Sequence, residues 1–336
     1  MSEFAIFIAL PEELGAAIEV LKANGDFQGA VSDIEAGRST FRYELTNGPG
    51  TGKTGDVFLI RGMGNTKSAA FVGASIVAGS PPQYALLIGI SGSLAPETVK
   101  LGDVVISAHV KYYAPDKIKD IPHDNWKIIS PEESSKICNP DHPEQVTHYR
   151  DGYSTLLDGR DKRFESSYYR YIRHSIVRDS EEYSIDKFMS MRKKIHGESC
   201  ANGFSLFSGA VLGSNLVLDS KYYVDYLIEK NRCSDMDFYM LNSPEEFKER
   251  CKWDSSELLA VDMESYGFFT AFEDMKRISQ GTHAIAVRGI SDLASGKEDL
   301  DRETKGKHRH NATKRAVQVG IDYLQEQFQP SRFRLP

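Results

Sequence analysis

Short runs of apolar residues alternate along most of the chain with segments whose apolar residues recur at helical spacing. Residues 4–10 and 84–90 are continuous apolar runs, and residues 284–292 form a third run that ends in a carboxylate. Such runs are typical of strands buried on both faces. Further strand-like runs occupy residues 39–46, 56–61, 101–107, 204–212 and 258–261, and helices are predicted at residues 11–21, 65–76, 222–230 and 311–328. Alternating strands and helices predict a three-layer α/β domain, although the pattern alone does not fix the strand order.

The pattern weakens in two stretches. Residues 112–203 carry scattered prolines, aromatic residues and many charges, and residues 231–256 are a shorter polar segment. We interpret both as insertions into a single domain that spans residues 1–336, and in the first we expect some local helix packed on the core. The basic residues of the first insertion include Arg160, Lys162, Arg163, Arg170, Arg173, Arg178, Arg192, Lys193 and Lys194. They predict either a solvated face or a lid whose arginines meet a phosphorylated part of a ligand.

Composition narrows the functional classes. Of 336 residues, 40% are hydrophobic and 26% charged, which is ordinary for a globular protein with a sizeable core. The formal net charge of -7 argues against nucleic acid as the main partner. No apolar run approaches the length of a membrane span, and the N-terminal segment lacks the features of a signal peptide. Four cysteines without a C-x-x-C pair favour neither disulfides nor a zinc site, so we expect a cytoplasmic protein. We also expect no metal and no cofactor.

The glycine-rich loop at residues 47–55 nearly matches a P-loop. Asn47 stands where that motif needs glycine, and the residues after the loop form a strand-like run rather than a helix. We therefore predict a glycine-rich hairpin at this position.

Acidic residues follow several of the predicted strands. Asp292 ends the run at residues 284–292, Glu264 lies where the strand at 258–261 passes into a helix, and Glu12 and Glu13 begin the helix after the first strand. Ligands of open α/β sheets bind beyond the carboxyl ends of the strands, so these side chains are candidates for catalysis. A structural alternative exists for each, because acids at helix starts stabilise the helix dipole and aspartates are frequent in turns.

Six segments of the predicted core together resemble one enzyme family. They are Ala9-Leu10-Pro11-Glu12-Glu13-Leu14, Arg61-Gly62-Met63-Gly64-Asn65, Gly89-Ile90-Ser91-Gly92-Ser93-Leu94, Leu101-Gly102-Asp103-Val104-Val105, Val261-Asp262-Met263-Glu264-Ser265 and Arg288-Gly289-Ile290-Ser291-Asp292. In this order they resemble the nucleoside phosphorylase superfamily, and within it the 5'-methylthioadenosine/S-adenosylhomocysteine nucleosidases. The resemblance covers the core and leaves both insertions unmatched.

The resemblance implies a nucleoside phosphorylase-like fold, with a mixed, barrel-like central sheet between helices, and a site that binds a purine nucleoside. By the same resemblance, Asp292 protonates or hydrogen-bonds N7 of the leaving base, Glu264 holds the ribose hydroxyls, and Glu13 orients or deprotonates the attacking water. The implied substrate-binding positions are Met263 at the sugar, Leu216 and Val217 at the base, Ser91 and Gly92 between sugar and base, and Ser291 beside Asp292.

The chemistry of N-glycosidic bonds agrees with three carboxylates in these roles. Bond breakage passes through an oxocarbenium-like state, so the sugar needs negative charge nearby while the departing base needs a proton. Carboxylates from separate segments can divide this work if their environments separate their pKa values, which keeps an acid protonated and a base ionised.

The nucleophile is predicted to be water. Phosphorolytic relatives carry an arginine just before the glycine that corresponds to Gly89 and a serine just after it, whereas this chain has Leu87, Ile88 and Ile90 there. Glu12 and Glu13 would also repel a phosphate dianion. One departure concerns the base: the nucleosidases usually have Ser-Gly-Asp followed by an aromatic residue where this chain has Gly213-Ser214-Asn215-Leu216.

The sequence therefore predicts a purine nucleosidase that releases free base from a nucleoside or nucleotide, with an adenine-type base favoured. A 5'-phosphorylated substrate is one version, suggested by the basic insertion. A phosphate-dependent purine nucleoside phosphorylase and a non-catalytic nucleotide-binding sensor are the alternatives. Because members of this family usually assemble, we also expect a homo-oligomer.

Overall fold

The computed structural model describes residues 2–79, 81–113, 118–120, 164–166, 172–196, 203–215, 217, 258–295, 297–304 and 306–329. The chain divides into two compact units. The first comprises Met1–Lys111, Ser175–Asp219 and Glu257–Pro336, and the second comprises Tyr112–His174 and Ser220–Ser256. In the second unit, β8 (Ile118–Asp120) and β9 (Phe164–Ser166) form an antiparallel pair.

The first unit is built on a mixed sheet whose centre is β5 (Tyr84–Ser93). The strand order is β10-β7-β12-β13-β5-β1-β4-β3-β2. In addition, β14 pairs with β5, β6 pairs with β14, and β11 pairs with β6. The other strands are β1 (Phe4–Ile8), β2 (Gly25–Phe27), β3 (Thr40–Leu45), β4 (Thr54–Leu59), β6 (Val104–Ser107), β7 (His109–Tyr113), β10 (Ile172–Val177), β11 (Leu206–Ser208), β12 (Ala210–Ser214), β13 (Leu258–Asp262) and β14 (His283–Asp292). β5 runs parallel to β1 and β14 and antiparallel to the end of β13. The described strands do not close into a barrel.

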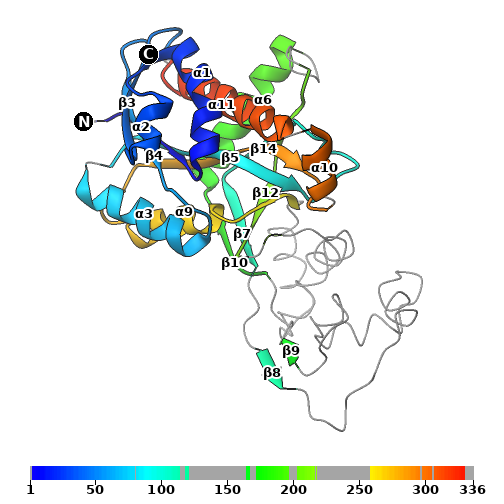
Figure 1. Cartoon of the computed structure of the whole chain (residues 1–336). Coiled ribbons are helices and arrows are strands. Elements are labelled where there is room, and N and C mark those ends of the chain that lie inside the picture. Colours follow the sequence, from blue (N-terminus) through cyan, green and yellow to red (C-terminus); the bar gives the residue numbers. More distant parts are fainter. Residues whose placement is uncertain are drawn as a thin grey trace. The chain divides into compact units, whose positions relative to one another are not determined.

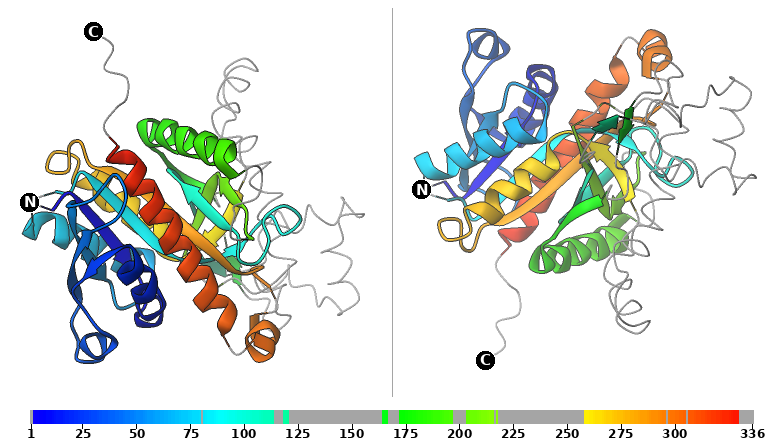
Figure 2. Two further views of the ribbon diagram at one scale, coloured as in Figure 1. Left: turned by 90° about the horizontal axis from the view of Figure 1, so that it is seen from above. Right: turned by 90° about the horizontal axis from the view of Figure 1, so that it is seen from below.

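Helices cover both faces of this sheet (Figures 1 and 2). On one face lie α1 (Pro11–Asn24), α6 (Asp179–His196) and α11 (Lys307–Gln327), and on the other lie α3 (Asn65–Ala78) and α9 (Ser265–Asp274). Two short helices, α2 (Val31–Glu35) and α10 (Lys297–Thr304), complete the described set. The prediction of three layers around a mixed sheet is confirmed.

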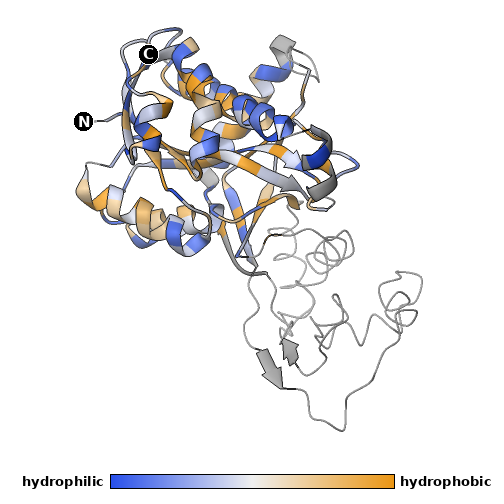
Figure 3. Cartoon of the chain, in the orientation of Figure 1, coloured by the Kyte–Doolittle hydropathy of each residue, from blue (hydrophilic) through white to orange (hydrophobic). Residues whose placement is uncertain are grey.

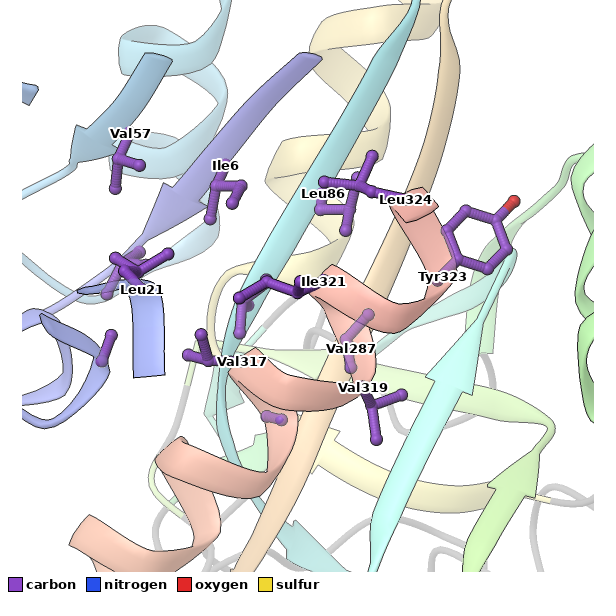
Figure 4. Packing of buried hydrophobic residues seen from close by; sticks show 14 of the residues in the cluster. Ile6, Leu21, Val57, Leu86, Val287, Val317, Val319, Ile321, Tyr323 and Leu324 are labelled. Atoms are coloured by element: carbon purple, nitrogen blue, oxygen red, sulfur yellow. The ribbon is translucent and has the colours of Figure 1, made fainter. Parts of the chain in front are cut away.

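Alternation along the strands gives each face its own core. In β1, Ile6 packs in the cluster under α1 and α11, while the next residue, Phe7, packs in the cluster with α3 and α9. Figure 4 shows Ile321 of α11 among the labelled members of the first cluster, together with Leu21 and Leu86. Burying such side chains stabilises the fold by roughly 1.5–3 kcal/mol each. Figure 3 shows that polar and apolar residues alternate along α11, as its position between the sheet and solvent requires.

The short helices α2 and α10 were not predicted. The helix α6 falls inside the first insertion, where some local helix packed on the core was expected, and its Ile185 and Phe188 are buried in the same cluster as the strands. The last helix begins at Lys307, before the predicted start, because Gly306 adopts a left-handed conformation that admits the turn. The predicted hairpin at residues 47–55 is confirmed, since it joins the antiparallel strands β3 and β4. The helix predicted at residues 222–230 lies outside the described residues.

In the part of the chain that the structure describes, no helix combines the length and apolar character needed to cross a membrane.

Candidate active site

A cavity of about 250 Å³ opens at the carboxyl ends of β1, β5, β13 and β14. These strand ends meet because Gly92 of β5 pairs with Val261 of β13 on one side and with Asp292 of β14 on the other. The cavity is lined by Ala9, Leu10, Glu13, Met63, Ile90, Ser91, Gly92, Val217, Val261, Asp262, Met263, Glu264, Ser291, Asp292, Lys297 and Arg309. The location is the one expected of a ligand site in an α/β protein.

Glu13 is fixed in the cavity wall by two main-chain donors. Its Oε2 accepts the N–H of Leu10 at 3.0 Å, as a residue in the first turn of α1 can do, and its Oε1 accepts the N–H of Ile90 at 3.0 Å. The residue is only 4% exposed, whereas the neighbouring Glu12 faces solvent. Burial raises the pKa of Glu13, and the charge of Arg288 partly opposes that rise. Glu13 can therefore accept a proton more readily than a carboxylate in water.

Arg288 is fully buried behind the cavity and joins its carboxylates. Its Nη2 lies 2.6 Å from Oδ2 of Asp262 and 3.6 Å from Oε2 of Glu264, and it also lies 3.2 Å from Oγ of Ser265. Asp262 in turn accepts the N–H of Ser265 at 3.0 Å, which anchors the start of α9. A buried guanidinium with these partners holds the end of β13, the end of β14 and the start of α9 in one arrangement.

Glu264 combines deep burial with neighbours of like charge. It is the residue directly before α9 and is 6% exposed. Burial, with Asp262 and Glu13 as further causes, raises the pKa of Glu264 from 4.5 to about 8, although Arg288 works in the opposite direction. Glu264 therefore holds a proton more strongly than a carboxyl group in water does.

Asp292 is held by donors on both of its oxygens. Oδ2 accepts the hydroxyl of Ser291 at 2.9 Å, and Oδ1 accepts the N–H of Ala294 at 2.9 Å. The register between β14 and β5 shifts between Ile290 and Asp292, and this irregularity carries the Asp292 side chain to the cavity. Lys297 at the start of α10 places Nζ 3.4 Å from Oδ1 of Asp292.

Two glycines of β5 make room for these charged groups. A Cβ on Gly89 would lie 2.6 Å from Nη1 of Arg288 and 2.9 Å from Oε1 of Glu13. A Cβ on Gly92 would lie 2.7 Å from Oδ1 of Asp292. The glycines of the segment at residues 89–94 are thus required by close approach of the site's side chains.

Most of the site residues expected from the sequence come together here. The cavity lining includes Glu13, Glu264, Asp292, Met263, Ser91, Gly92, Val217 and Ser291. Leu216 lies outside the described residues. Four residues of the site were not predicted from the sequence, namely Asp262, Arg288, Lys297 and Arg309. Arg288 could have been found from the sequence, because it is a charged residue inside the apolar run of β14 and such a charge needs a buried partner.

The basic residues of the first insertion have different surroundings. Arg178 lies 3.0 Å from Glu181 and 3.3 Å from Glu273, and Arg192 pairs with Asp322 of α11. Both arginines therefore take part in ion pairs within the first unit. Arg170 and the basic residues at 160–163 lie outside the described residues, as do the side chains of Arg173 and Lys194.

Among the described residues, no group of three or more His, Cys, Asp or Glu side chains is arranged to hold a metal ion.

Comparison with known proteins gives one family match and a set of similar folds. The model of the phosphorylase superfamily matches residues 3–325. No curated protein sequence matches the chain. Futalosine hydrolase of Helicobacter pylori strain 26695 has a similar structure, with a TM-score of 0.53 and 14% identity over 97% of this chain and 98% of that chain.

Two nucleosidases are similar to the same degree. The 5'-methylthioadenosine/S-adenosylhomocysteine nucleosidase of Helicobacter pylori, in complex with butyl-thio-DADMe-Immucillin-A, has a TM-score of 0.53 and 15% identity, over 97% of this chain and 99% of that chain. The nucleosidase of Neisseria meningitidis, in complex with methylthio-immucillin-A, has a TM-score of 0.51 and 15% identity, over 96% and 99% of the two chains. At these identities the likeness shows a shared fold.

Proposed function

Because the chain belongs to the phosphorylase superfamily, as its motifs predicted, we propose that it is a purine nucleosidase that hydrolyses the N-glycosidic bond of a nucleoside or nucleotide. The observation that carries the proposal is the convergence of Glu13, Glu264 and Asp292 from separate elements on one cavity. Similar folds in enzymes named as nucleosidases and as a hydrolase of futalosine support the same reaction class.

The geometry supports a division of labour between these carboxylates. Glu13, whose pKa is raised by burial, would orient the attacking water and accept its proton. Glu264, directly before α9, would accept hydrogen bonds from the ribose hydroxyls and place negative charge near the developing oxocarbenium ion. Asp292, in its hydrogen-bonded loop, would hydrogen-bond N7 of the base and supply its proton.

Arg288 would act as a positioning residue in this scheme. It touches Asp262 and Glu264, and its charge lowers the pKa of Glu13. It therefore keeps the carboxylates in place and limits how strongly they are neutralised.

Phosphorolysis is the second candidate reaction, and one observation favours it. Lys297 and Arg309 line the cavity, so cations are available to an anionic nucleophile. Against it, the donors of the Leu10 and Ile90 main chain near Glu13 are already occupied by that carboxylate. A dianion there would meet a second negative charge.

The reaction can be identified by chromatographic detection of free base from purine nucleosides, nucleotides and thioether nucleosides. We expect release in phosphate-free buffer, and loss of release in Asp292→Asn. Release only after addition of phosphate would make the protein a phosphorylase. Binding without release under either condition would favour the non-catalytic sensor.

The finer expectations stay predictions. They are an adenine-type base, a 5'-phosphate recognised by the first insertion, a homo-oligomer and a cytoplasmic location. Replacing Arg170 and Arg173 with alanine should weaken turnover of nucleotides selectively if the insertion binds the 5'-phosphate, and unchanged kinetics would reject that idea.

A further inference from the structure

The side chains of Asp292 and Lys297 form a pair on the cavity wall that the family motifs do not include. Nζ of Lys297 lies 3.4 Å from Oδ1 of Asp292, and the two side chains are 23% and 14% exposed. Both line the cavity, so both can reach a ligand in it. The inference that follows rests on the proposed function, in which Asp292 meets the purine base.

Two further hydrogen bonds hold the carboxylate of Asp292 in its orientation beside Lys297. Oδ2 accepts the Ser291 hydroxyl and Oδ1 accepts the Ala294 N–H, each at 2.9 Å. Ser291 is itself buried, and its hydroxyl lies 3.3 Å from the carbonyl oxygen of Ser91 on the neighbouring strand. A base that hydrogen-bonds to Asp292 would therefore have an ammonium group beside the same edge.

Purine bases differ at the position next to N7. In 6-oxopurines such as hypoxanthine and guanine, N7 and O6 are both acceptors, whereas adenine presents the N7 acceptor and an amino donor. A carboxyl group that gives its proton to N7, with an ammonium donor beside it, matches two acceptors. The amino group of adenine would place a donor against the ammonium group of Lys297, and that contact would be unfavourable.

We propose that Lys297 determines specificity for a 6-oxopurine base by donating a hydrogen bond to O6. When the bond between C1' and N9 breaks, its electron pair passes to the base, and negative charge spreads over N7 and O6. In this scheme Asp292 meets the substrate as the carboxylic acid, gives its proton to N7, and is left as the carboxylate that pairs with Lys297. Water then forms the new bond to C1' and gives its proton to Glu13, so the products are hypoxanthine or guanine and free sugar. The ammonium group of Lys297 stabilises the charge on O6. This proposal differs from the adenine-type base that the resemblance favours, and the following test decides between the two.

The test compares inosine, adenosine and purine riboside, which carries only hydrogen at C6. For the wild-type protein we expect kcat/KM for inosine to exceed that for adenosine by about tenfold or more, since a hydrogen bond to a charged donor is worth about tenfold to a hundredfold. Lys297→Met should remove that advantage, lowering kcat/KM for inosine by about the same factor more than it lowers kcat/KM for purine riboside. Lys297→Arg should restore part of the preference, because it keeps a cationic donor.

Lys307→Met is the matched control, because Lys307 is an exposed residue at the start of α11 and is not part of the cavity lining. Preference of the wild-type protein for adenosine would overturn the proposal, as would an equal loss for all three substrates in Lys297→Met. If no substrate releases base, the proposed function fails, and calorimetry with the free bases decides the inference separately. Tighter binding of hypoxanthine than adenine, lost in Lys297→Met, would support it, and equal binding would overturn it.

Discussion

The cavity holds its carboxylates in two different ways. Glu13 is buried and bonded to main-chain N–H groups of Leu10 and Ile90, with Arg288 nearby. Asp292 stands on a more accessible wall beside Lys297, which belongs to a separate short helix. The first arrangement depends on the backbone of two core elements, and the second on a side chain that a single substitution can change. In the proposed mechanism, bond cleavage therefore depends on groups fixed by the core, and the choice of base depends on a side chain at the edge of the site.

Removing the buried cation Arg288 should affect the protein most. Arg288→Met removes the cation from Asp262 and Glu264 and leaves buried carboxylates without compensation. We expect the free energy of unfolding to fall by about 3–5 kcal/mol, measured by chemical denaturation at pH 7.

The control for this change is Arg42→Met. Arg42 pairs with Asp56 at 3.2 Å, and its side chain is 40% exposed, so its loss should cost about 1 kcal/mol or less. Equal stability of Arg288→Met and the wild-type protein would show that the buried carboxylates are neutral without the arginine.

The next prediction concerns the rate of the reaction and not the stability of the fold. Glu13→Gln keeps the size of the side chain but removes the base, so kcat should fall by about 10² to 10⁴. Glu12→Gln, one residue earlier on the exposed side of α1, should leave kcat unchanged. Steady-state kinetics of base release measure both variants, and similar kinetics for both would remove Glu13 from the mechanism.

A smaller effect concerns how the raised pKa of Glu264 makes stability depend on pH. The pKa of Glu264 is raised from 4.5 to about 8 in the folded protein, so the stability that comes from retaining its proton is complete below about pH 4.5 and is lost as pH rises through about 8. Without ligand, Tm should therefore fall between about pH 5 and pH 8 on account of this group. Over the same range kcat/KM should rise, because the ionised carboxylate accepts the ribose hydroxyls.

Glu264→Gln imitates the protonated carboxyl and should flatten the contribution of this group to Tm, whereas Glu12→Gln should not. Differential scanning fluorimetry at a series of pH values measures both. Parallel pH curves for Glu264→Gln and the wild-type protein would show that another group causes the decline.

Some elements and site residues could be predicted from the sequence, and others could not. The continuous apolar runs placed β1, β5 and β14, and the carboxylates after the strands identified Glu264 and Asp292 as candidates. Some helix was expected in the first insertion, but the bounds of α6 were not, because its sequence is rich in charge, and only packing shows that Ile185 and Phe188 join the core. Arg288 escaped as a site residue because its partner Asp262 lies on another strand, and pairing between strands is not visible in local sequence.

Local patterns of apolar and polar residues were enough to predict the layers of the fold and the types of side chain at the strand ends, because burial patterns are local and periodic. Only the folded structure shows that Arg288 contacts Asp262 and Glu264, and that Lys297 lies beside Asp292. The reason is physical: a carboxylate's pKa and its partners depend on burial and on charges from distant segments, and both exist only once the chain is folded.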